Sequence, residues 1–236
     1  MNYGMGYYYH YDWTYLLVLV GAILSMVASA RVNSTFNKYA RVRSMCGMSA
    51  AQIARKILDR NGLSNIPIEQ IGGNLSDHYD PASRVLRLSD STYNSASVAA
   101  IGVAAHECGH ALQHQEGYKP LTFRNTIVPA ANFGSKAGIP LILIGLIFGV
   151  GGNFLIQLGI WVFSLAVLFQ IVTLPVEFNA SKRALVMLED YGILGEQENR
   201  QAKKVLSAAA MTYVAAAAAS ILQLLRLVLL FGKRRD

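Results

Sequence analysis

The chain has 236 residues, of which 53% are hydrophobic and only 15% are charged, and its mean hydropathy of +0.32 is unusual for a soluble globular protein. The net charge of +7 would suit nucleic acid, but Lys and Arg are absent from residues 1–30 and 137–181, and no basic motif is interleaved with aromatic residues. Composition therefore favours a membrane protein, excludes nucleic acid as a partner, and assigns the basic excess to the flanks of membrane spans.

The first predicted element is a membrane span over residues 13–30. This uncharged run of 18 residues would reach about 27 Å as a helix, close to the thickness of the hydrocarbon core. Its end, Ala28-Ser29-Ala30, resembles a signal-peptidase site, but no positive charge precedes the run and basic residues follow it at once. We therefore predict a retained anchor, with residues 1–12 outside the cytoplasm.

Residues 31–126 are polar enough to form a water-exposed portion at the cytoplasmic face. Ser49 to Gln52 fits a capping box at the start of a helix. Residues 66–71 (IPIEQI) and 84–89 (RVLRLS) are short β-prone segments, so we expect a small β-sheet. The second segment would be an edge strand, open to pairing with an extended peptide.

The segment His106-Glu107-Cys108-Gly109-His110 follows an apolar run and matches the pattern HExxH. On a helix, residues four apart differ by about 40° and about 6 Å of rise, so both imidazoles can bind one zinc ion within reach of Glu107. Zinc with three protein ligands lowers the pKa of water towards about 7 and polarises a carbonyl group, while the glutamate takes and returns the proton. This pattern predicts a catalytic helix.

Two further apolar runs follow, at residues 130–150 and 155–175, and Gly151-Gly152-Asn153 joins them. So short a link predicts an antiparallel hairpin of membrane spans. The hairpin would return the chain to the cytoplasmic side, where residues 176–206 would form a second catalytic portion.

The last apolar segment, residues 207–231, is rich in alanine and then in leucine. A full crossing would place the basic residues 233–235 outside, against the positive-inside tendency. Two alternatives stay open. Either the helix crosses the membrane, or its alanine half packs on the water-exposed part while its leucine half lies in the interface.

The third metal ligand must come from outside the HExxH helix. His114 lies about 12 Å along the axis from His106, too far for both to share a metal. The extended metzincin pattern also fails after His110. Glu177 is the best candidate, because it directly follows the second span of the hairpin and the other carboxylates have more solvated surroundings. We expect Pro175 to start a helix that carries Glu177 in its first turn.

HECGHALQH, PVEFNASKRA and SDHYDP together resemble the YugP-like family of neutral, membrane-embedded bacterial zinc metallopeptidases over nearly the whole chain. HExxH followed by a hairpin and Glu-Phe-x-Ala is more distantly similar to membrane gluzincins of the HtpX and CAAX-protease kind. The resemblance implies a mainly α multipass protein of the bacterial plasma membrane, with a gluzincin-like core, a small sheet, and membrane or membrane-proximal proteins as substrates. It also implies one zinc ion held by His106, His110 and Glu177, with Glu107 as the base.

One departure from those gluzincins concerns the residues around the ligands. The relatives have Asp four residues after the ligand glutamate, whereas this chain has Ser181, so Ser181 or Asn179 would orient the ligand histidines. His78 or Tyr79 is a candidate transition-state donor, with a simple Asp/Pro turn as the alternative. Arg183 would hold an oxyanion or substrate terminus, or merely flank the membrane.

Two other functions stay open. A site-2-type intramembrane protease also uses HExxH but places it inside a span, whereas here the apolar run before His106 is about ten residues long. A non-catalytic membrane assembly or chaperone-like protein would carry a structural or vestigial zinc site, although the intact Glu107 argues against it, because a structural site needs no base. The sequence specifies neither a regulatory membrane partner nor an oligomeric state.

Overall fold

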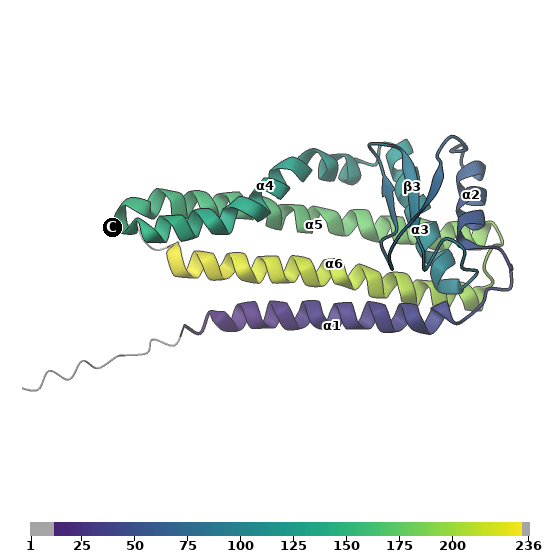
Figure 1. Ribbon diagram of the computed structural model, residues 1–236, viewed down its shortest axis with the longest axis horizontal. Helices are drawn as coiled ribbons and strands as arrows, with labels where there is room; N and C mark the ends of the chain where they lie inside the picture. The colour runs from purple at the N-terminus through teal and green to yellow at the C-terminus, as the bar shows by residue number, and fades with distance from the viewer. Residues whose placement is uncertain (1–11, 233–236) are drawn as a thin grey trace, which may run out of the picture.

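The computed structural model describes residues 12–232, in which long helices run side by side and a smaller unit lies at one end (Figure 1). The elements are α1 (Tyr15–Ala40), α2 (Ala50–Arg60), β1 (Ile68–Ile71), β2 (His78–Asp80), β3 (Val85–Ser89), α3 (Val98–Gln115), α4 (Lys119–Ile147), the 3-10 turn η1 (Gly149–Gly152), α5 (Asn153–Asp190) and α6 (Glu196–Phe231). The predicted outer segment 1–12, except for Asp12, and the basic tail 233–235 lie outside the described residues.

Within residues 12–232, four stretches of helix are long and apolar enough to cross a membrane: α1, α4, η1 with α5, and α6. Each helix extends beyond the apolar run from which it was predicted. α1 continues past residue 30 to Ala40, and α4 begins at Lys119, where Pro120 suits a helix start. A charged residue ends an apolar run, but Lys and Arg are good helix formers and do not end a helix.

The predicted hairpin is formed by α4 and α5, whose backbones approach closely through glycine. A Cβ on Gly138 would lie 2.8 Å from the Cβ of Phe163. The prediction that Pro175 starts a helix is wrong, because α5 runs unbroken from Asn153 through this proline to Asp190. Proline removes one helical hydrogen bond, whereas ending the helix in apolar surroundings would leave several backbone groups unpaired.

Helix α6 lies antiparallel to α1 along most of its length (Figure 1). A Cβ at Gly21 would touch Ala219, and Arg226 forms an ion pair with Asp12 at 3.3 Å. The N-terminal part of α6 packs on the smaller unit through Ala202 and Leu206. The leucine-rich half thus lies against α1 instead of turning away from the helix bundle.

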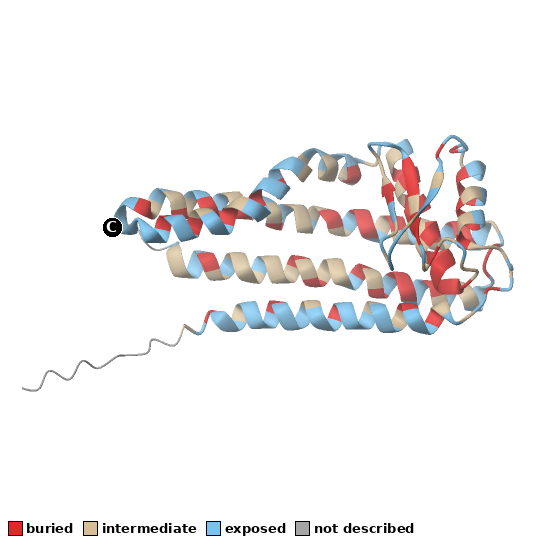
Figure 2. Cartoon of the chain, viewed as in Figure 1, coloured by how far each residue is buried: buried red, intermediate tan, exposed pale blue. Residues whose placement is uncertain are grey.

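Buried residues are concentrated in the smaller unit (Figure 2). Most of the largest fully buried side chains belong to it. The capping box at Ser49 is confirmed, with the Gln52 N–H donating to the Ser49 Oγ at 3.3 Å. Its helix, α2, buries Ile53 and Ile57 in a core shared with the sheet and α3.

The sheet has the order β1-β3-β2, with β1 parallel and β2 antiparallel to β3. The prediction that residues 84–89 form an edge strand is therefore wrong. Residues 78–80 supply a third strand, which pairs with the other edge of β3, and the side chains of Leu86 and Leu88 are buried in the core shared with α2 and α3. The strand at the edge beside α3 is β2.

Candidate metal centre

The helix α3 presents the HExxH residues from within the protein core. Ser97 caps it, accepting a hydrogen bond from the Ala100 N–H, and the apolar residues that follow are buried. His106 and His110 stand one turn apart, with ring centroids 4.7 Å from each other. The sequence thus places two imidazoles on one face of a helix that packs against α2, α5 and α6.

Glu177 reaches this face because α5 approaches α3 closely. A Cβ at Gly109 would lie 2.7 Å from the carbonyl oxygen of Ala180, so glycine permits the contact. The Glu177 Oε2 atom lies 3.3 Å from the His106 Nε2 and 3.5 Å from the His110 Nε2. The structure therefore brings together the three residues predicted as ligands, from segments that are far apart in the sequence.

The donor set of these three residues fits a zinc ion. Their ligand atoms all lie within 4.8 Å of one another, and two imidazole nitrogens with one carboxylate oxygen are typical of catalytic zinc. Burial alone would lower the pKa of His110, but the carboxylates of Glu177 and Glu107 raise it above its ordinary value. The cluster therefore favours positive charge.

The second ring nitrogen of each histidine also has a partner. Ser181 Oγ lies 3.1 Å from the His106 Nδ1, and the Gln113 Oε1 lies 2.9 Å from the His110 Nδ1. The Gln113 amide donates in turn to the Asn179 Oδ1 at 2.9 Å. Such contacts fix the orientation of ligand histidines. Ser181 thus contacts one ligand directly, and Asn179 is linked to the other through Gln113.

The arginine at the centre is Arg124 and not Arg183. Arg183 pairs with Glu116 at 2.8 Å and donates to the Asn179 Oδ1 at 2.7 Å, so it is linked to His110 only through Asn179 and Gln113. Arg124, from α4, places its Nη1 at 3.3 Å from the Glu177 Oε1, the oxygen opposite the one facing the histidines. Sequence reasoning missed Arg124, because a basic residue shortly before an apolar run is typical of a membrane flank.

Glu107 is held by the edge strand β2. Its Oε2 accepts the Tyr79 N–H at 2.9 Å, and the Tyr79 hydroxyl lies 2.8 Å from the His114 Nδ1. The His78 side chain is exposed and hydrogen-bonds to the Ser76 carbonyl. The predicted Asp/Pro turn is also present, since Asp80 accepts the N–H of Ala82 just after β2.

Two cavities meet at the metal centre, with volumes of about 360 and 230 Å³. Glu107, Glu177 and Tyr213 line both cavities. His78 and Arg124 line the larger cavity, and Leu75 and Val103 give the smaller one an apolar wall. Tyr213 comes from α6 and was not predicted, although it is a polar residue within an alanine-rich run.

Comparisons with known proteins identify the family of this chain. Residues 14–232 match the model of a family described as "Putative neutral zinc metallopeptidase". The chain is 48% identical over 223 residues to the "Putative membrane protease YugP" of Bacillus subtilis (strain 168), and the match covers 94% of this chain and 98% of that protein. No solved structure matches the chain. The chain belongs to the neutral zinc metallopeptidase family that its motifs resemble.

Proposed function

We propose that the protein is a membrane-bound zinc-dependent endopeptidase. The observation that carries this proposal is the convergence of His106, His110 and Glu177 beside Glu107, at the junction of two cavities. A cluster of two partly buried histidines and two buried glutamates would be costly as a merely structural feature, and a structural zinc site would not need Glu107.

In this proposal, His106, His110 and Glu177 hold the zinc ion. When bound, zinc supplies a Lewis acid that polarises the scissile carbonyl group and acidifies the attacking water. Glu107 takes the proton from water and returns it to the leaving amine. The Tyr79 N–H holds the carboxylate of Glu107 at the edge of β2.

Two residues absent from the sequence prediction complete the proposed site. Arg124 binds one oxygen of Glu177 and thereby leaves the other directed at the histidines. Tyr213 lines both cavities beside Glu107, where its hydroxyl can donate to a developing oxyanion. His78 lines the larger cavity and is the alternative donor.

The proposed substrate is an extended segment of a membrane or membrane-proximal protein. The edge strand β2 borders the larger cavity, so an extended peptide can lie alongside it while its side chains enter the two cavities. The smaller cavity, with Leu75 and Val103 in its wall, suits an apolar side chain.

We also propose that α1, the α4–α5 hairpin and α6 cross the bacterial plasma membrane, with the metal centre at the cytoplasmic face. Four basic residues at positions 31–43 of the sequence, directly after the first apolar run, support this orientation. The site-2-type alternative loses support, because α3 belongs to the core of the smaller unit and is not among the four membrane-length stretches.

Metal content and proteolysis, measured together, test the proposal. Glu107→Gln should retain about one zinc ion per chain yet cleave a membrane-anchored peptide substrate about 10² to 10⁴ times more slowly, since it removes only the base. Glu177→Ala should lose both zinc and activity. Glu69→Gln, an exposed position on β1, is the matched control and should change neither.

Unchanged proteolysis in Glu107→Gln would overturn the assignment of the base. Zinc retained in Glu177→Ala would overturn the assignment of the third ligand. A folded wild-type protein that binds zinc but cleaves no substrate would support the alternative of a non-catalytic membrane assembly or chaperone-like protein.

A further inference from the structure

A groove of about 770 Å³ between α1 and α6 shares no lining residue with the two cavities at the metal centre. Side chains from both helices give it a strongly basic lining. Its five cations are Arg31, Lys38, Arg200, Lys203 and Lys204. The hydroxyl groups of Thr35 and Ser207 add hydrogen-bond donors to the same surface.

Most of this positive charge is not neutralised by the protein. Arg200 pairs with Glu196, on the same helix. Within residues 12–232, the other four cations of the groove form no ion pair with a carboxylate. Like charges held close together repel one another, so an anion with several oxygens would stabilise this arrangement.

The groove lies at the boundary between the apolar and the charged part of each helix: the apolar run of α1 ends there, and that of α6 begins there. Arg31 is the first cation after the apolar run of α1, and Met211, at the apolar end of the groove, is exposed on α6. Val27 and Leu24, one and two turns before Arg31, are also exposed. The surface therefore offers cations for a headgroup and, directly beside them, aliphatic side chains for acyl chains.

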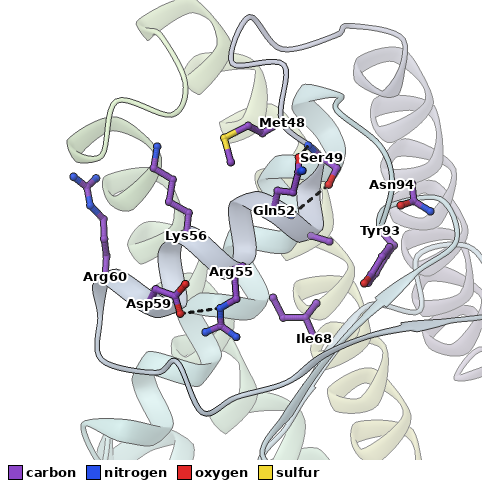
Figure 3. Close-up of a pocket in the computed structure, with 11 residues that line it drawn as sticks. Met48, Ser49, Gln52, Arg55, Lys56, Asp59, Arg60, Ile68, Tyr93 and Asn94 are labelled. Carbon is purple, nitrogen blue, oxygen red and sulfur yellow. Dashed lines mark hydrogen bonds and ion pairs between the residues drawn. The ribbon is translucent and has the colours of Figure 1, made fainter.

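A second basic groove on the protein provides a contrast. It has about 840 Å³ and follows α2, as Figure 3 shows. There Arg55 is bound to Asp59 at 2.8 Å, and the Arg60 guanidinium stacks over the ring of Tyr191 at 4.6 Å. The lining of this second groove thus includes a carboxylate, Asp59, whereas no carboxylate lines the groove between α1 and α6. The helix α2 is also not among the membrane-length apolar stretches found within residues 12–232.

We propose that the groove between α1 and α6 binds the headgroup of an anionic phospholipid. Its phosphate and any second negative charge lie among the four cations without carboxylate partners, and its acyl chains lie on the exposed aliphatic side chains of both helices. The proposal rests on the membrane placement of α1 and α6. It does not depend on zinc or on proteolysis, so the two proposals can fail separately.

Native mass spectrometry of the detergent-purified full chain can test this assignment, with phosphatidylglycerol and phosphatidylcholine as probes. Wild type should retain one phosphatidylglycerol molecule under conditions that remove phosphatidylcholine. Lys203→Gln/Lys204→Gln should weaken retention about 30-fold, from about fivefold for each lysine. Lys203→Arg/Lys204→Arg should restore it, because the charge is kept.

The matched control, Lys56→Gln/Arg60→Gln, removes the same charge from the groove along α2 and should leave lipid retention unchanged. Equal loss in this control would overturn the site, because it would indicate non-specific attraction to the basic protein. Full displacement of the lipid by millimolar inorganic phosphate would overturn the assignment to a lipid. Circular dichroism of each variant separates loss of binding from loss of fold.

Discussion

In the unit formed by α2, the sheet and α3, large aliphatic side chains point inwards and are shielded from solvent, whereas along the α4–α5 hairpin many of them point outwards and the helices meet through glycine. Ile57 of α2 is fully buried, whereas Ile147 of α4 is 82% exposed. The first pattern suits water, where burial of apolar surface drives folding. The second suits lipid, where close packing must hold helices together.

The comparison also explains how the metal centre is built. His106 and His110 lie on α3, in the unit whose aliphatic side chains are buried. Glu177 lies on α5, the second helix of the α4–α5 hairpin. The geometry of the proposed ligand set therefore depends on both kinds of packing, and a change in either region should alter the distances among the three residues.

The largest effect is expected from truncating a core residue of the smaller unit. Ile57→Ala should lower the free energy of unfolding by about 2 to 5 kcal/mol, because it leaves a cavity among fully buried neighbours. Ile147→Ala, the same change on the exposed face of α4, should stay within about 0.5 kcal/mol. Denaturant unfolding in mixed micelles compares the two, and equal losses would contradict the proposed difference between the regions.

Adding a methyl group inside the hairpin should have the next largest effect. Gly138→Ala brings a Cβ to 2.8 Å from the Cβ of Phe163 and should cost about 1 to 3 kcal/mol of unfolding free energy. Gly151→Ala, at the turn of the same hairpin, meets no atom within 4 Å and is the control. Thermal unfolding in detergent should separate the two variants, and matching midpoints would argue against packing through glycine.

A smaller effect is expected where the two regions meet. Ser181→Ala removes the partner of the His106 Nδ1 and should weaken zinc binding about 10-fold, whereas Ser181→Asp should preserve or strengthen it. Ser164→Ala, which removes a hydroxyl bonded within α5 itself, should leave zinc binding unchanged. Competition with a chelator measures the affinities, and no difference between the two alanine variants would refute the positioning role of Ser181.

The smallest expected effect concerns chemical labelling of the two cysteines, which tests whether the core of the smaller unit is closed to solvent. Cys46 is partly exposed, whereas Cys108 is buried and burial raises the pKa of its thiol, so little reactive thiolate forms there. A maleimide reagent should therefore modify one thiol in the native protein and two after unfolding. Mass spectrometry of the labelled peptides identifies the sites, and native labelling of Cys108 would show that the core opens.

Sequence periodicity and motif spacing could predict the apolar runs, the capping box at Ser49 and the helix that carries His106 and His110, because these features depend on neighbouring residues. They could not place Pro175 correctly. Whether a proline ends a helix depends on the surroundings of the freed backbone groups, which in α5 are fixed by the packing of the hairpin.

The contacts of the candidate site were predictable only in part. Glu177 could be proposed as a ligand from its position after the hairpin, and its approach to α3 then depends on Gly109. Arg124 and Tyr213 could not be placed from the sequence, because each reaches the site through packing between helices. Gln113 stands three residues after His110 on α3 itself, but sequence spacing alone does not show that its side chain turns towards the histidine. An arginine near an apolar run has the same pattern whether it binds a buried glutamate or only flanks a membrane.

The continuity of α5 from the hairpin to Glu177 has a consequence for biosynthesis. His106 and His110 leave the ribosome before the α4–α5 hairpin is made. Glu177 follows only after α4 and the preceding part of α5 have been synthesised. The nascent chain therefore holds two of the three ligands until α5 folds back against α3. Under the proposed function, an enzyme assembled in this order would be kept from cleaving proteins until its own insertion into the membrane is nearly complete.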